Sequence, residues 1–476
     1  ESAWRGNDSA WTGIIGYYDD ETHAPVVELI AHCRLHGIPV MFWNKEDPVH
    51  FNRFKRTAAL CDYVFTTDAR TIVDYNALPD NQITTVASAP FAAQPLLHNP
   101  LPSTRAQDEA IAYGGTYYGD KYATRKQGLD FLFYESAPHG LAIYERVHND
   151  PNSPYRLPDR FRRYARGSLS YPEMCQAYKA HPIHLNGNSV VDSPSMFSRR
   201  VVEITASGST VLSSAGRGVD ETLAGTVPTV TTPDEAAAYL EGWKSSEQRR
   251  HAGLWEAFRH VYETHTCAHR LVYMMRVAGF RVRSPQAAPI AVECAAADVP
   301  LFEAQTMRPA LYLVTDTTEG VDAASPVVLA ALPERVAKLQ EAGIRNVVIH
   351  REGAPVLDEH LVEDFSLALH FGPWKAVGTR TVEWSPGDAH VRIAALTADI
   401  DEGTVLVDAD VYAGSVLGER PALADDEVFA WQHVVEHVGK VTYTDSTAVP
   451  IDTAVVHEEA DPLPPVASGE AGPPVG

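Results

Sequence analysis

The sequence predicts an α/β protein in which parallel sheets carry helices on both faces. Short apolar runs alternate with amphipathic stretches along most of the chain, which is the pattern of strands and helices in such sheets. The 476 residues and the 45% hydrophobic content fit about three domains with cores of their own.

The first predicted domain spans residues 1–100. Apolar spacing predicts helices at 25–36 and 51–60, and buried strands are expected at 38–43, 63–66 and 83–86. A proline-rich crossing at 90–102 ends this domain. Since ligands of parallel sheets bind at the carboxyl ends of strands, residues 44–50 are expected to line a cleft.

The second predicted domain spans residues 101–283, and a third α/β region spans 307–452. Small residues and prolines at 284–306 predict a linker, and the acidic, then Pro- and Gly-rich residues 453–476 predict a disordered tail. The expected strands are 110–113, 141–144, 183–185, 210–213, 311–314, 346–350 and 404–407. The expected helices are 251–275 and 332–343.

The most informative stretch is residues 186–221. It predicts a loop, a short helix that closes at Gly208, a buried strand and a second loop. The N-terminus of a helix beside small-residue loops can bind an anion through its free N–H groups. A carboxylate further along the same helix, Glu203, can reach a ribose, as a nucleotide-diphosphate sugar requires.

Three ordered motifs resemble group 1 glycosyltransferases of the GT-B fold, most closely their spore-maturation-protein (CgeB-like) branch. One is Leu-Asn at 185–186 with Arg-Arg-Val-Val-Glu at 199–203 and Ser-Gly-Ser-Thr-Val-Leu-Ser at 207–213. Another is Phe-Trp-Asn-Lys-Glu-Asp-Pro-Val-His-Phe at 42–51. The third is Gly-Gly-Thr-Tyr-Tyr at 114–118 with Arg125 behind it.

The resemblance implies a GT-B fold of two Rossmann-like domains. The first is expected to be truncated, because Glu1 falls within a segment that follows a strand in the family. The implied donor-binding residues are Gly114, Gly115, Thr116, Arg125, Asn186, Ser195, Arg199, Arg200 and Glu203. Many group 1 enzymes carry another glutamate eight positions before the one that matches Glu203. In this chain Ser195 stands at that position, which leaves the sugar and the stereochemical outcome open.

Each donor residue also has a structural interpretation. Guanidinium groups suit phosphate oxygens, yet Arg199 and Arg200 are also spaced to pair with Glu203 on one helix face. The Gly114-Gly115-Thr116 turn can bring backbone amides against phosphate or be a simple turn. Asn186 is a candidate for contacting the donor or for capping a loop.

The candidate catalytic residues are Glu46, Asp47 and His50, which follow a predicted strand. A carboxylate or histidine there can take the proton of an acceptor hydroxyl. Asp47 also precedes a proline and is a good turn starter, and Glu46 can pair with Lys45. Glu1 and Trp4 are expected in the same cleft, or in the core.

The charge balance limits the partners. A net charge of -23 argues against nucleic-acid binding and simple adsorption to anionic membranes. A basic cluster (Arg160, Arg162, Arg163 and Arg166) is either a local docking patch or a solvated helix face. Five scattered cysteines predict reduced thiols, and neither a membrane span nor a signal peptide is visible.

No metal site is predicted. Asp408-Ala409-Asp410 after a strand is a pattern that can bind a divalent cation, but such triplets arise by chance among 62 acidic residues. His265 and His269 are expected to pack in a helix rather than bind zinc. In the third region, Val377-Gly378 faintly resembles the closing part of family 2 glycosyltransferase domains.

Together these observations predict a hexosyltransferase-type glycosyltransferase that needs no cofactor and uses a nucleotide-diphosphate sugar. A glycan, glycopeptide or other cell-envelope acceptor is expected, with no nucleic acid partner. The expected location is the cytoplasm, with at most peripheral contact with the inner face of the membrane. Two alternatives stay open: a non-catalytic module that binds nucleotide sugars or glycans, and a GT-B-fold sugar-nucleotide epimerase.

Overall fold

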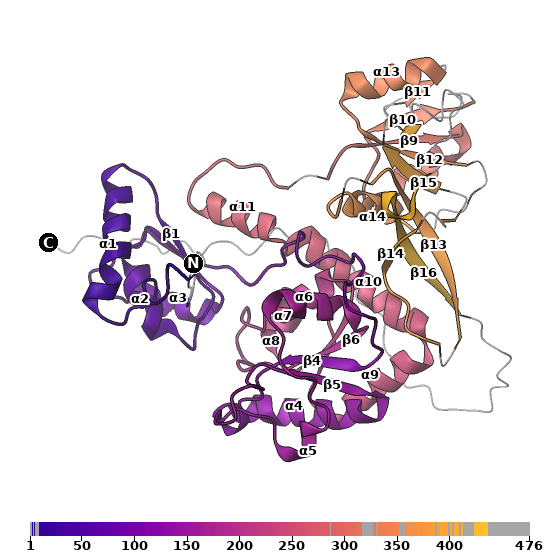
Figure 1. Cartoon of the computed structure of the whole chain (residues 1–476). Helices are drawn as coiled ribbons and strands as arrows, with labels where there is room; N and C mark the ends of the chain where they lie inside the picture. The colour runs from indigo at the N-terminus through magenta and orange to yellow at the C-terminus, as the bar shows by residue number, and fades with distance from the viewer. Residues whose placement is uncertain are drawn as a thin grey trace. The chain divides into compact units, whose positions relative to one another are not determined.

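The computed structural model contains three β-sheets with helices packed against them (Figure 1). It describes residues 2, 4, 9–285, 287–316, 327–329, 332–351, 354, 358–372, 374–385, 388–397, 400–401, 404–408, 411–412 and 423–436. The predicted α/β class with parallel sheets is confirmed. Glu1, Asp410 and the predicted tail 453–476 lie outside the described residues.

The first sheet has three parallel strands, β1 (Met41–Asn44), β2 (Tyr63–Thr66) and β3 (Thr85–Ser88). Its helices are α1 (Asp20–Leu35), α2 (Phe51–Ala59) and α3 (Ile72–Asn76). Helix α1 begins five residues before the predicted start, because the Asp19 carboxylate caps it by accepting the Thr22 amide at 2.8 Å.

The second sheet is fully parallel, with strands in the order β5-β4-β6-β7-β8. The strands are β4 (Ile111–Gly115), β5 (Leu141–Glu145), β6 (Ile183–Asn186), β7 (Thr210–Ser214) and β8 (Thr229–Val230). Counted along the chain this order is 2-1-3-4-5, so the connection reverses direction between β4 and β6. Ligands of such sheets bind outside the carboxyl ends of the strands at this reversal.

Helices cover both faces of the second sheet. They are α4 (Ala123–Ser136), α5 (Asp159–Arg162), α6 (Tyr171–Ala180), α7 (Arg200–Ala206), α8 (Arg217–Thr222), α9 (Pro233–Ser245) and α10 (Glu247–Thr264). All described residues of β4 to β7 except Gly114 are buried, which explains why these strands were recognisable as apolar runs.

The predicted single helix at 251–275 is wrong: the chain forms α10 and a separate helix α11 (Cys267–Val277). The break falls where the backbone of Ala93 bonds to His265 and Cys267, at 2.8 and 2.7 Å. The Thr266 side chain then caps the new helix. Helix α11 packs on the first sheet through Met274, which shares a cluster with Phe65 and Ala87.

The third sheet is mixed, in the order β11-β10-β9-β12-β15-β13-β16-β14. Its strands are β9 (Ile290–Cys294), β10 (Leu311–Val314), β11 (Val327–Leu329), β12 (Asn346–His350), β13 (Ala376–Trp384), β14 (Ala394–Leu396), β15 (Thr404–Asp408) and β16 (Val428–Glu436). Its helices are α12 (Val299–Glu303), α13 (Leu332–Ala342) and α14 (Leu361–Ala368). The predicted linker at 284–306 therefore contains β9 and α12, because its apolar residues complete this sheet.

A buried ionic cluster joins the third sheet's connection at 390–393 to α10. Glu247 and Arg250 are both almost fully buried and paired, and Glu247 also binds His390 Nδ1 and the Val391 amide, each at 2.6 Å. Burial would raise the pKa of Glu247, but hydrogen bonds from Arg250 and His390 lower it to about 2.

Replacement of Gly208 by alanine should destabilise the fold by about 1–3 kcal/mol. Gly208 has φ +76°, and an added Cβ would lie 2.5 Å from Ile393 Cγ2 and 3.1 Å from Pro100 Cβ. Gly253→Ala in α10 is the matched control, since nothing lies within 4 Å of its added Cβ. That change should stabilise by about 0.5–1 kcal/mol in denaturant unfolding. Equal effects of the two changes would contradict this account.

Candidate functional site

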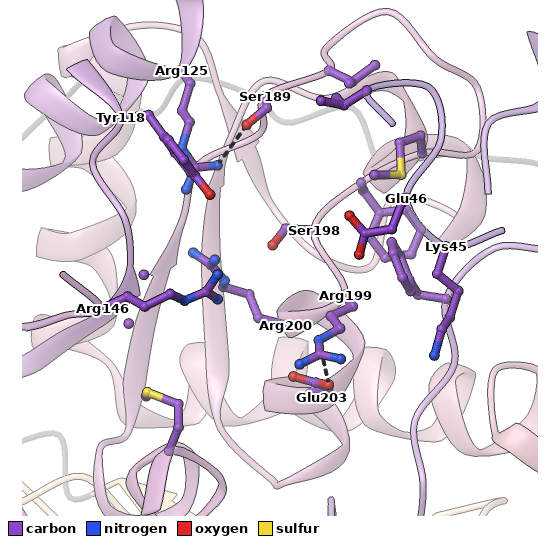
Figure 2. A pocket seen from close by; sticks show the side chains of 18 of the residues that line it. Lys45, Glu46, Tyr118, Arg125, Arg146, Ser189, Ser198, Arg199, Arg200 and Glu203 are labelled. Carbon is purple, nitrogen blue, oxygen red and sulfur yellow. Dashed lines mark hydrogen bonds and ion pairs between the residues drawn. The ribbon is translucent and has the colours of Figure 1, made fainter. Parts of the chain in front are cut away.

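A cavity of about 550 Å³ lies at the carboxyl ends of the strands. Residues that directly follow β1 and β5, the end of β4, the loops after β4 and β6, and the N-terminal turn of α7 line it (Figure 2). The cavity therefore occupies the crevice that the strand order of the second sheet predicts.

One side of this cavity is basic. Figure 2 shows Arg146, which follows β5, and Arg200, which opens α7, reaching into the cavity, with Arg125 on the same side and Glu46 on the opposite side. Five basic and two acidic side chains line the cavity (Lys45, Arg125, Arg146, Arg199, Arg200, Glu46 and Glu203). Their formal charge of +3 contrasts with -23 for the whole chain, so the site is built for an anion.

Two arginines of this wall share one tyrosine. Arg125 donates to the Tyr113 hydroxyl at 2.8 Å, to the Gly187 carbonyl and to the Thr116 carbonyl at 3.3 Å. Burial alone would raise the pKa of Tyr113, but the guanidinium groups of Arg125 and Arg200 lower it. The wall is thus held rigidly by neutral oxygens that do not cancel its charge.

Nitrogen atoms of the same two arginines lack partners. Arg125 Nε and Arg200 Nη1 are buried and donate to no hydrogen-bond acceptor among the described residues. Arg146 is exposed, and its side chain makes no ion pair or hydrogen bond within the described part of the chain. Unpartnered buried donors are costly, which indicates that an anionic ligand completes this wall.

The prediction of a phosphate-binding turn at Gly114 and Gly115 is wrong in its geometry. Both residues belong to β4 and pair with β5. A Cβ on Gly114 would lie 2.5 Å from Met174 Sδ, and one on Gly115 would lie 3.0 Å from the Arg200 guanidinium. The glycines line the cavity, and they leave room for the side chains that form its floor.

Glu203 lines the cavity and is held by a chain of hydrogen bonds. The Gln94 amide donates to His98 Nδ1 at 3.0 Å, so neutral His98 carries its proton on Nε2. That nitrogen lies 2.9 Å from the Tyr171 hydroxyl, which donates to Glu203 Oε1 at 2.8 Å. Burial lowers the pKa of His98, in keeping with the neutral form.

The predicted pairing on this helix face is also present. Arg199 Nε lies 3.3 Å from Glu203 Oε1, and the Tyr178 hydroxyl donates to Glu203 Oε2 at 3.3 Å. Arg200 makes no such ion pair among the described residues and lies in the cavity wall instead. The two arginines therefore differ in role: Arg199 holds the carboxylate of Glu203, and Arg200 remains available to bind an anion in the cavity.

Of the candidate catalytic residues, Glu46 and His50 line the cavity and Asp47 does not. Neither the Glu46 carboxylate nor the His50 ring has a hydrogen bond or ion pair within the described chain. The His50 ring packs edge-on against Trp4, with centroids 4.9 Å apart. Glu46 and His50 are thus free to meet a ligand.

Asp47 is fully buried and has a structural role instead. Its carboxylate accepts from Asn44 at 2.7 Å, Thr66 at 2.7 Å and Tyr75 at 2.9 Å. Burial raises the pKa of Asp47 to about 7, against the hydrogen bonds from Thr66 and Tyr75, which lower it. The carboxylate ties β1 to β2 and α3 beneath the cavity.

Three predicted donor residues lie outside the cavity lining. Thr116 is buried and offers its carbonyl to Arg125, and Asn186 is buried against Asn188 and Ser213. Ser195 accepts the Ala69 amide and donates to the Thr67 carbonyl, each at 2.9 Å. Its short side chain fits that contact, which explains why no donor-binding group projects from this position.

Sequence reasoning missed several lining residues. Arg146 follows β5 directly, and its place at a strand end was a usable signal. Tyr171 opens α6 and gave no signal, because its contact with Glu203 spans 32 positions. Tyr118 also lines the cavity and has a left-handed backbone, with φ 62°, which suggests a constrained position.

Within the described residues there is no group of three or more metal-ligating side chains. His265 lies in the break between α10 and α11 rather than in the helix that was expected. Its Nε2 binds the Thr222 carbonyl at 2.7 Å and its Nδ1 binds Arg270 at 2.8 Å. No described helix has the length and apolar character needed to cross a membrane.

Asp47→Asn should change the pH dependence of stability. The folded pKa of about 7 lies well above the ordinary pKa of an aspartate, about 4. The contribution of protonated Asp47 is therefore present below about pH 4 and is lost as the pH rises through 7. Urea unfolding of the variant should lack this decline, while the cavity still binds its ligand. An unchanged decline would contradict this assignment.

A sequence profile of a family described as glycosyl transferase-like matches residues 128–276. This stretch runs from α4 into α11 and includes Arg146, Arg200 and Glu203. No curated protein matches the chain.

Solved structures also resemble the chain. Sucrose-phosphate synthase from Thermosynechococcus elongatus is 15% identical; the match covers 54% of this chain and 78% of that one, with a TM-score of 0.38. HepE from Anabaena in complex with UDP-glucose is 12% identical, with coverage of 55% and 77% and a TM-score of 0.39. The trehalose-phosphate synthase of Burkholderia vietnamiensis is 10% identical, with coverage of 56% and 79% and a TM-score of 0.34.

Residues 128–276 supply most of the basic wall and the buried carboxylate of Glu203. Residues 128–276, which lie in an α/β fold with parallel sheets, are therefore similar in sequence to the glycosyl transferase-like family.

Proposed function

We propose that this protein is a glycosyltransferase of GT-B type that moves a hexosyl group from a nucleotide-diphosphate sugar to a hydroxyl acceptor. The donor binds against the second sheet, and the acceptor approaches from the residues that follow β1. The observation that supports this most is the basic wall with unpartnered guanidinium nitrogens beside the reversal point of the second sheet.

Charge balance supports a diphosphate leaving group. When the sugar departs, the nucleoside diphosphate gains negative charge, and the lining carries a formal +3. Fixed guanidinium groups in a partly enclosed site stabilise such charge without reorganising. In this proposal Arg200, Arg125 and Arg146 supply the stabilisation, and no divalent cation is needed.

Glu203 is proposed to hold the donor ribose. A carboxylate offers about four acceptor sites, and the contacts from Tyr171, Tyr178 and Arg199 leave capacity for a ribose hydroxyl. Because these donors fix both oxygens in place, the carboxylate is positioned before the donor arrives.

Glu46 is the proposed base. The acceptor hydroxyl attacks the anomeric carbon, its proton passes to Glu46, and the bond from that carbon to the phosphate oxygen breaks. Glu46 is favoured over His50 because its carboxylate faces the basic wall across the cavity (Figure 2). This assignment describes direct displacement, and the group 1 resemblance leaves retention of configuration as the other outcome.

We also propose that the protein belongs to the CgeB-like subtype, that its acceptor is a glycan, a glycopeptide or another cell-envelope molecule, and that it acts in the cytoplasm. HepE, whose structure was solved with UDP-glucose, makes UDP-glucose a sensible first donor to test.

Arg200→Ala should weaken binding of UDP or GDP about 10- to 100-fold, because a charge-assisted contact to the diphosphate is lost. Isothermal titration calorimetry measures this. Arg217→Ala is the matched control, since Arg217 also opens a helix but pairs with Glu221 outside the cavity lining. Equal affinities for the two variants would contradict the proposed donor site.

Glu46→Gln should lower kcat about 10²- to 10⁴-fold with donor affinity unchanged, because only proton transfer is removed. Product analysis with and without acceptor separates the alternatives: an epimerase converts the donor without acceptor, and a binding module gives no product. Glu28→Gln, on an exposed position of α1, serves as the control. A Glu46→Gln enzyme with full activity would exclude Glu46 as the base.

A further inference from the structure

The end of α11 carries a stretch with an unusual charge balance. Residues 265–292 contain no aspartate or glutamate, although the chain has 62 acidic residues among 476. The same stretch has four arginines, of which Arg276, Arg281 and Arg283 are exposed. The protein is strongly acidic overall, but the charged side chains of this stretch are all basic.

The backbone of this patch is fixed by its hydrogen bonds. Gly279, with φ +85°, closes α11. Its amide bonds to the Arg276 carbonyl at 2.9 Å, and the Phe280 amide bonds to the Met275 carbonyl at 2.9 Å. This pair of bonds is a Schellman motif. Phe280 is thus held in place by the helix end, with 39% of its surface exposed.

The arginines of the patch are not paired with carboxylates among the described residues. Arg276 donates to the Val282 carbonyl at 3.1 Å and to Ser284 Oγ at 2.9 Å, which are neutral acceptors. Arg281 and Arg283 have no carboxylate partner within the described residues. Arg276, Phe280, Arg281, Val282 and Arg283 line a shallow depression of about 460 Å³.

We infer that this patch (Arg276, Phe280, Arg281, Val282 and Arg283) docks the protein on an anionic lipid surface. The arginines meet the headgroups, and Phe280 enters the boundary between headgroups and acyl chains. A soluble anion would use the arginines and leave Phe280 in water, so the exposed aromatic ring within the basic patch favours a bilayer. The attachment is reversible and weakens with salt.

The other basic cluster is a poor competitor. Arg160 pairs with Asp130 at 2.8 Å, and Arg162 pairs with Asp159 at 2.9 Å, so acidic partners cancel part of its charge. Because α11 packs on the first sheet through Met274, docking at its end attaches the sheet whose loop carries Glu46 to the bilayer.

Vesicle co-sedimentation of the full chain tests the inference. Vesicles of phosphatidylcholine alone are compared with vesicles that also contain phosphatidylglycerol. The wild type should bind only the anionic vesicles and dissociate in high salt. Arg281→Glu/Arg283→Glu should lose binding about ten-fold or more, and Phe280→Ser should weaken it at constant charge. Retained nucleotide binding and unfolding temperature show that the variants are folded.

Arg163→Glu/Arg166→Glu reverses the same number of charges in the other cluster and should bind like the wild type. The inference is overturned if the wild type binds neither vesicle, or if the control loses binding as strongly as the α11 variant. It is also overturned if inorganic phosphate displaces the protein and Phe280→Ser binds normally, since the patch would then be a phosphate site.

Discussion

The site depends on two positively charged arginines, Arg125 and Arg200, that pack against the buried hydroxyl of Tyr113. Arg125 and Arg200 both lie against Tyr113, with nitrogens that have no acceptor among the described residues. Repulsion between two desolvated guanidinium groups is tolerable when neutral oxygens hold them and an anion completes the shell. Gly115 makes this packing possible, because any side chain there would press on Arg200. The glycine at the end of β4 is thus required by the guanidinium group that packs against it.

Much of the fold was predictable because it is encoded locally. The strands β2, β10 and β12 occur at the predicted residues, since short apolar runs bounded by turns leave few alternatives. The errors came from long-range contacts. The break before α11 depends on Ala93, far away in the sequence, and β9 was hidden in a small-residue stretch that only the third sheet makes into a strand.

The candidate site residues divide in the same way, into those with a local sequence signal and those placed by long-range contacts. Glu203 and Arg200 were predicted to bind the donor because they belong to a sequence motif. Both line the cavity. Asp47 was predicted as catalytic, but its burial by Thr66 and Tyr75 could not be read from neighbouring residues. Ser195 was assigned to the donor by position, whereas its hydroxyl bonds to the backbone near residue 68. Arg146 belongs to no motif, and only its position directly after β5 indicates that it lines the cavity.

In the proposed donor site, the basic wall binds the diphosphate of a nucleotide sugar. A crystal structure of the protein soaked with UDP or GDP tests it most directly. The account predicts diphosphate oxygens against the guanidinium groups of Arg200 and Arg146, with a ribose hydroxyl within hydrogen-bond distance of Glu203. A nucleotide bound elsewhere, with the wall facing only water, would contradict it.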